Sequence, residues 1–237
     1  MTRKFYRVEN SPINLNQVYQ SKNYQYGRNL DFSYYQHFLN VYFNVMRQVD
    51  IPSDFFVSLN NRIFTESNLY RQYLNDLIAD EEYVELYAVT SNINHSGFKI
   101  PVSLISDFIN NFKGNQQFIF FDNGIYLWEF ILEAVRLNWY SHLPKRLESV
   151  FLFDDLKSCQ YYIKEHLNNV GTIYEVELIQ VVKMFEGDMM LIDNVQNHIL
   201  FLDLMTQMND YWKGVHTQDP IREIIFQGSY LYTRIIK

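Results

Sequence analysis

Segments with the residue pattern of β-strands lie at both ends of this chain, and a long, largely helical block separates them. The segment FYRVE at residues 5–9 is short and β-prone, and a turn-like Asn-Ser-Pro follows it. Further strand patterns come after residue 149. Strands from the two ends can complete their hydrogen bonds by pairing in one sheet. The layout therefore predicts a single α+β domain over residues 1–237, with a helical insertion at about 31–140.

The block at 31–140 has the spacing of amphipathic helices. Residues 32–48 carry apolar side chains at i, i+3, i+4 and i+7 positions. Helices are also predicted within 66–89 and, after Pro101, in VSLISDFINNF. The last helix, at 124–140, is apolar on nearly every side, which is typical of a buried helix.

After Pro144 the pattern alternates between strands and helices. SVFLF at 149–153 is typical of a strand, and a helix is predicted to follow from Asp154 or Asp155, both good N-cap residues. Residues 172–182 alternate apolar and charged side chains with the period of a strand. A helix is predicted at 198–214, and the final β-prone runs around Gln-Gly-Ser predict a hairpin.

Charge and cysteine content exclude several classes of protein. The 20 Lys and Arg against 27 Asp and Glu give a net charge of -7, so overall electrostatics do not favour binding to nucleic acid. The single cysteine, Cys159, excludes an internal disulfide framework and any multi-thiolate metal site. The N-terminus lacks a signal-peptide pattern, and the apolar runs are too short to span a membrane. We expect a soluble, cytoplasmic protein without membrane contact.

The sequence also lacks several common catalytic patterns. Its eight glycines are scattered, which excludes the GxGxxG and GxxxxGKS phosphate-binding motifs. Its six histidines show no zinc-binding spacing, and we expect no metal site. Cys159 falls on the apolar side of an apparent helix, where a small core residue is expected instead of a nucleophile.

Three short segments together resemble the motif regions of ADP-ribosyltransferases. They are FYRVE (5–9), RLESVFLFDDLKSCQYYI (146–163) and REIIFQGSYLYTRI (222–235). In the second segment, SVFLFDD is similar to the family's strand "GIYFAD", with Phe151 at the position of its tyrosine and Tyr162 eleven residues later. The resemblance covers about a third of the chain and implies a split β-sheet core of the ADP-ribosyltransferase type.

The stretch EAVRLNWYSHLPKRLESVFLF at 133–153 is also similar to a bacterial family of unknown function, the DUF2441 group. The similarity lies in a proline followed by a basic residue and the S-V-F-x-F run, with Lys145 in place of a serine. That group has an ADP-ribosyltransferase-like fold in our interpretation. The insertion at about 31–130 resembles no family that we can name.

The resemblance to ADP-ribosyltransferases implies that NAD is the co-substrate. Cleavage of the bond between nicotinamide and ribose passes through an oxocarbenium-like transition state, which a nearby carboxylate stabilises. Glu223 matches the catalytic glutamate at the start of a late strand. Arg7 matches the first-strand arginine, whose guanidinium can hold the diphosphate or ribose through paired hydrogen bonds.

Four further residues complete the NAD site that the resemblance implies. Ser149 matches a polar residue that contacts the nicotinamide ribose and orients the glutamate. Tyr162, and Phe151 on the preceding strand, supply aromatic surface for the nicotinamide ring. Arg146 is expected to add a second phosphate contact.

The acceptor of ADP-ribose stays open. Ile221 stands two positions before Glu223, where arginine-modifying enzymes carry an acidic residue, so arginine is disfavoured as the acceptor. A protein or a nucleic acid can accept the group, and a toxin or effector of this type would have an antitoxin or immunity partner. The alternatives are NAD hydrolysis, with water as acceptor, and a non-catalytic interaction module on the same fold.

Overall fold

The structure is a computed structural model that describes residues 3–30, 33, 36–59, 83–87, 97–111, 125–196 and 198–236. The chain is divided into two compact units. The sheet unit comprises Met1–Asp31, Ile125–Val195 and Met205–Lys237, and the insertion unit comprises Phe32–Gly124 and Gln196–Leu204. Helices and antiparallel strands are both present, which confirms the predicted mixture of α and β structure.

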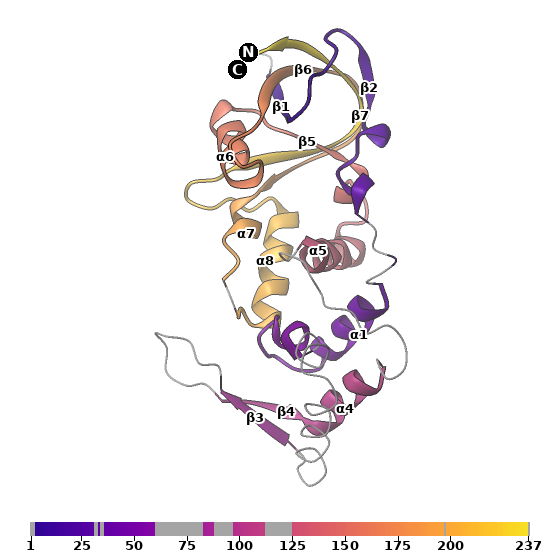
Figure 1. The fold of residues 1–237 in the computed structure, drawn as a ribbon, viewed down its shortest axis with the longest axis vertical. Coiled ribbons are helices and arrows are strands. Elements are labelled where there is room, and N and C mark those ends of the chain that lie inside the picture. The colour runs from indigo at the N-terminus through magenta and orange to yellow at the C-terminus, as the bar shows by residue number, and fades with distance from the viewer. Residues whose placement is uncertain are drawn as a thin grey trace. The chain divides into compact units, whose positions relative to one another are not determined.

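The sheet unit is built on five antiparallel strands in the order β1-β6-β7-β2, with β5 also paired to β7 (Figure 1). The strands are β1 (Phe5–Glu9), β2 (Val18–Gln20), β5 (Val150–Leu152), β6 (Thr172–Asp188) and β7 (Arg222–Ile235). β1 pairs with the first part of β6, and β2 pairs with the second half of β7. Strands from the two ends of the chain therefore share one sheet.

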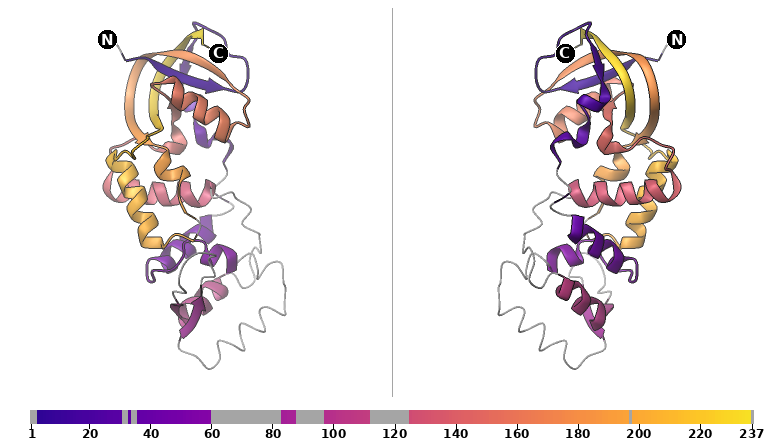
Figure 2. Two further views of the ribbon diagram at one scale, coloured as in Figure 1. Left: turned by 90° about the vertical axis from the view of Figure 1, so that its left-hand side faces the viewer. Right: turned by 90° about the vertical axis from the view of Figure 1, so that its right-hand side faces the viewer.

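β6 and β7 form one long, curved pair, and Figure 2 shows them bending together. Two register shifts, at Ile179 and Val182, place extra residues in β6, and such bulges increase bending. Gly228 of β7 has a φ of 154°, and a Cβ there would lie 1.9 Å from the carbonyl oxygen of Gln180. The predicted hairpin around Gln-Gly-Ser is wrong. This glycine permits a close approach of two strands, and β7 continues through it.

The two faces of this sheet bury different apolar clusters. One cluster contains Tyr174, Tyr230 and Tyr232 together with aliphatic residues of β5 and β7. The other lies beneath α6 (Leu156–His166) and contains Cys159, which is fully buried as predicted. Asp155 caps α6 by accepting the backbone N–H of Ser158, as one of the two expected N-cap residues.

Two helices continue the sheet unit. α5 (Ile125–Trp139) confirms the helix predicted at 124–140, and α8 (Phe201–Lys213) confirms the later one. The indole of Trp212 donates to the carbonyl oxygen of Leu132 at 2.8 Å, which fixes the C-terminal part of α8 against α5. No helix in the described part of the chain is both long and apolar enough to cross a membrane.

The carboxylate of Asp188 organises the end of β6. It is fully buried and accepts hydrogen bonds from the backbone N–H groups of Met190, Thr217 and Ile221 and from the Thr217 hydroxyl. These bonds fix the short helix α7 (Met190–Asp193) and the backbone just before β7. A carboxylate with this many donors is a structural anchor.

The insertion unit contains helices and a hairpin. α1 (Gln36–Met46) and α4 (Val102–Asn111) fall inside two of the predicted helices. β3 (Tyr83–Tyr87) pairs with β4 (Gly97–Pro101), so the helix predicted over 66–89 is wrong at its C-terminal end, and its earlier part lies outside the described residues. The segment YVELY has the β-branched and aromatic residues of a strand, and pairing with β4 outweighs its helical spacing.

Candidate functional site

A pocket opens in the sheet unit between β1, β5, α6 and the segment that follows β2. It is lined by Arg7, Val8, Tyr24, Tyr26, Val150, Phe151, Phe153 and Tyr162. Its volume is about 90 Å³, which is well below the roughly 300–1,000 Å³ of sites that enclose a drug-sized ligand. As it stands, the pocket has room for one end of a dinucleotide.

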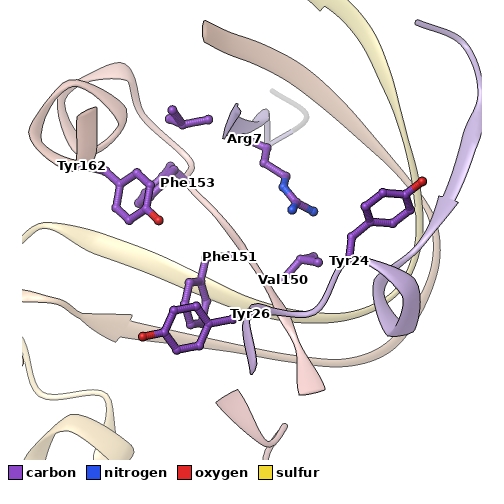
Figure 3. A pocket seen from close by; sticks show the side chains of 8 residues that line it. Arg7, Tyr24, Tyr26, Val150, Phe151, Phe153 and Tyr162 are labelled. Atoms are coloured by element: carbon purple, nitrogen blue, oxygen red, sulfur yellow. The ribbon is translucent and has the colours of Figure 1, made fainter. Parts of the chain in front are cut away.

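Arg7 supplies the positive charge of the pocket. Its Nε lies 2.6 Å from Oε1 of Glu9, and Nη1 donates to the hydroxyl of Tyr230. The hydroxyl of Tyr232 donates to the same Glu9 oxygen. Figure 3 shows the guanidinium projecting between Tyr24 on one side and the Tyr162 side of the pocket on the other. Glu9 and Tyr230 thus hold two of the three nitrogens of Arg7, whose side chain lines the pocket.

Aromatic rings form most of the pocket wall. Tyr162 projects from α6 and packs against Phe153, with 5.4 Å between ring centroids. Tyr26 packs against Phe151 at 4.8 Å. A pocket with flat, apolar walls and one guanidinium is suited to a ligand that combines an aromatic ring with an anionic group.

Next to the Phe151 ring lies a buried ionic cluster around Arg146. The Arg146 guanidinium lies 4.8 Å from the Phe151 centroid, and its Nε donates to both carboxylate oxygens of Glu129 at 3.1 and 3.2 Å. Its Nη1 donates to Oε1 of Glu223 and to the hydroxyl of Tyr211. The Tyr211 hydroxyl in turn donates to Oε1 of Glu223 at 2.6 Å. We call these four residues, Arg146, Glu129, Glu223 and Tyr211, the Arg146 cluster.

The Arg146 cluster holds two carboxylates and one guanidinium away from water. Burial disfavours the charge of Arg146, but Glu129 and Glu223 outweigh it and raise the pKa of the guanidinium well above its ordinary value. Burial also raises the pKa of Glu129, although Arg146 opposes this effect. One cation therefore serves two carboxylates, and Glu129 binds a proton more readily than an exposed glutamate does.

Glu223 lies next to the pocket but is not part of its lining. Glu223 is only 2 % exposed. Burial raises the pKa of Tyr162, and the charge of Glu223 raises it further while Arg7 opposes the rise. The Tyr162 phenol is thus within electrostatic range of both groups. Phe151 is common to both regions, because it lines the pocket and its ring lies 4.8 Å from the guanidinium of Arg146, the bonding partner of Glu223.

The structure places the six predicted site residues in three positions. Arg7, Phe151 and Tyr162 line the pocket. Arg146 and Glu223 are bonded to each other in the buried cluster. Ser149 is fully buried, and its hydroxyl donates to the carbonyl oxygen of Lys145 at 2.7 Å.

Sequence reasoning missed several partners in this region. Glu129 is a single carboxylate within the apolar run IYLWEFIL, a position that signals a buried charge in need of a cation. Tyr26 lies in the segment that follows β2, and it packs on Phe151. Nothing local marks Tyr211, which lies twelve residues before Glu223 and bonds to it across the fold.

The region shows no feature of a metal site. Among the described residues, no group of three or more His, Cys, Asp or Glu side chains is arranged to hold an ion. Burial raises the pKa of Cys159 to about 12, so this thiol stays protonated at neutral pH. The pocket and the Arg146 cluster supply carboxylates, guanidinium groups and phenols.

Comparison with known proteins gives one family. No curated protein matches the chain. A family model described as "Protein of unknown function (DUF2441)" matches residues 8–237, which is nearly the whole length. The chain therefore belongs to the DUF2441 family.

Proposed function

We propose that this protein is an NAD-dependent mono-ADP-ribosyltransferase whose sheet is of the ADP-ribosyltransferase type. The observation that carries the proposal is the placement of Arg7 and Glu223. The guanidinium lines an aromatic pocket, and the carboxylate is buried close to it, held by Arg146 and Tyr211. Both charges act on the same phenol, that of Tyr162.

The proposed reaction uses these groups in distinct roles. Arg7 binds the diphosphate, and the rings of Phe151 and Tyr162 contact the nicotinamide end. The bond between C1′ of the ribose and the nicotinamide nitrogen breaks, and its electron pair leaves on nicotinamide. Glu223 stabilises the positive charge that develops at C1′. The acceptor atom then bonds to C1′ and loses its proton to solvent or a base.

This proposal requires Glu223 to reach the ligand. Phe151 and Tyr26 line the pocket and pack on each other, Phe151 also packs on Arg146, and burial raises the pKa of Tyr26, with the charge of Glu129 adding to the effect. Binding of the whole dinucleotide must displace these rings, because the pocket volume is about 90 Å³. An acceptor that enters from the same side, either a protein or a nucleic acid, would complete the site in the cytoplasm.

A non-catalytic interaction module is the second candidate. It is favoured by the hydrogen bonds of Glu223, whose Oε1 accepts from both Arg146 and Tyr211 while the residue is 2 % exposed. In that case the pocket would bind a nucleotide or a partner's side chain without breaking a bond. An antitoxin or immunity protein is a fitting partner for either candidate.

Radiolabelled NAD separates these candidates. The wild-type protein is incubated with labelled NAD and cell lysate, and label is counted in the protein and nucleic-acid fractions while free nicotinamide is measured. Glu223→Gln should abolish transfer, and Glu177→Gln, at an exposed position of β6, should retain it. Nicotinamide release without transfer would indicate hydrolysis. Binding of NAD without either product would support the module, and no binding would overturn the proposal.

A further inference from the structure

Tyr162, in the pocket wall, packs against two rings. One is Phe153, and the other is the imidazole of His166, which stacks almost parallel to the phenol ring with an interplanar angle of 21° and 5.2 Å between centroids. His166 is one helical turn further along α6. The histidine therefore contacts the pocket through the tyrosine and is not itself part of the lining.

The orientation of His166 is fixed from α7. Its Nε2 lies 2.9 Å from Oδ2 of Asp193, and the hydroxyl of Tyr161 donates to the same oxygen at 3.0 Å. α7 is in turn held by the Asp188 carboxylate, which accepts the backbone N–H of Met190. A chain of contacts thus runs from a buried structural anchor to a ring of the pocket wall.

We propose that His166, held by Asp193, is a positioning residue that fixes the ring of Tyr162 for ligand binding in the pocket. The half-exposed His166 can exchange protons with water, whereas Tyr162 is largely enclosed. The role concerns the same pocket as the proposed function and rests on it for the identity of the ligand. The placement of Tyr162 can nevertheless be measured without any ligand.

The charges around His166 favour its protonated form. The hydrogen bond that His166 donates to Asp193 raises the pKa of His166, burial lowers it, and the charges of Asp193, Glu223 and Glu165 raise it, for a net increase. The other titratable groups against the ring are Tyr161 and Tyr162 of its own helix. The imidazolium is thus present below and somewhat above the usual pKa, and its charge is lost as the pH rises further.

The first test uses the protein without ligand. Carbon-13 NMR of the tyrosine rings, with Tyr162 assigned from Tyr162→Phe, follows the Tyr162 signals as the pH is raised. In the wild type they should shift with the titration of His166. In Asp193→Asn the midpoint should move to lower pH. His216→Gln is a matched control, because His216 lies 3.8 Å from Glu186 and is not packed on Tyr162. The proposal would be overturned if the Tyr162 signals did not shift with the titration of His166 and did not change in Asp193→Asn.

The second test measures the affinity for ADP-ribose by calorimetry at pH 6 and pH 8.5. His166→Gln should raise Kd by about fivefold at pH 6, the scale of one lost aromatic contact. The difference from the wild type should shrink at pH 8.5, where a larger fraction of the histidine is neutral. An equal Kd for both proteins at pH 6 would overturn the role in binding. If the wild type binds no ADP-ribose at either pH, the proposed function fails, and the NMR titration still decides the positioning role.

Discussion

Arg146, which is buried, and Arg7, which is half-buried, are two arginines of one unit with different surroundings. Arg146 is bonded to two carboxylates and lies against the rings of Phe151 and Tyr211. Arg7 is paired with a single carboxylate, Glu9, and lines a pocket. An arginine that neutralises an excess of buried negative charge supports the fold, whereas one held in place at a pocket can bind an anion. The comparison predicts opposite consequences when each is removed.

The largest expected effect is the loss of stability in Arg146→Ala. This change leaves Glu129 and Glu223 buried without their cation, which typically costs about 3–5 kcal/mol. Urea unfolding followed by circular dichroism measures the free energy of unfolding. Arg234→Ala is the control, because Arg234 forms an exposed ion pair with Glu175 whose loss should cost under about 1 kcal/mol. Equal effects of the two changes would contradict a supporting role for Arg146.

The next effect concerns ligand affinity in Arg7→Gln. Loss of a charge-assisted contact should raise the Kd for ADP-ribose by about 10–100-fold, because such hydrogen bonds contribute about 1.5–3 kcal/mol. The free energy of unfolding should fall by less than in Arg146→Ala, because only Glu9 loses its cation. An unchanged Kd, measured by calorimetry, would remove the distinction between the two arginines.

A smaller effect is expected for Tyr211→Phe. The lost hydroxyl accepts from Arg146 and donates to Glu223 at 2.6 Å, and its removal should cost about 1–2 kcal/mol in urea unfolding. Tyr140→Phe is a matched control at a half-buried position, where one bond to Asn209 is lost. If Tyr140→Phe lowers the free energy of unfolding more than Tyr211→Phe does, the Arg146 cluster contributes less to stability than its burial indicates.

The smallest effect is a change in pH dependence for Glu129→Gln. The folded protein raises the pKa of Glu129, so its contribution to stability is fully present below the unfolded pKa and is lost as the pH rises through the folded pKa. Glutamine cannot ionise, so the variant should lose less stability than the wild type between about pH 4 and pH 8. Parallel stability curves in urea would show that Glu129 is ionised throughout.

Sequence patterns located most elements of the sheet unit because their signals are local. The run SVFLF and the N-cap at Asp155 correctly placed β5 and α6, and the alternation after Thr172 correctly placed the start of β6. The interpretation of Gly228 failed because a glycine in a strand signals either a turn or a close approach. Only the position of the Gln180 carbonyl distinguishes the two.

The candidate site was less accessible to prediction, since its bonds join distant segments. Arg7 bonds to Tyr230, and Arg146 bonds to Glu129 and Glu223. The resemblance selected Arg146 and Glu223 individually, but their direct ion pair depends on how η3 (Arg146–Glu148) and β7 meet in three dimensions. Neither spacing nor periodicity carries that information.

The close contact between Gly228 and the Gln180 carbonyl also fixes the register of the two longest strands, β6 and β7. If β7 were shifted by one residue along β6, the side chain of Gln227 or Ser229 would clash with that oxygen. The shifted pairing of the two strands is therefore disfavoured. The same shift would turn Glu223 to the opposite side of the sheet. Because it has no side chain, Gly228 thus keeps Glu223, five residues earlier, on the side of the sheet where Arg146 lies.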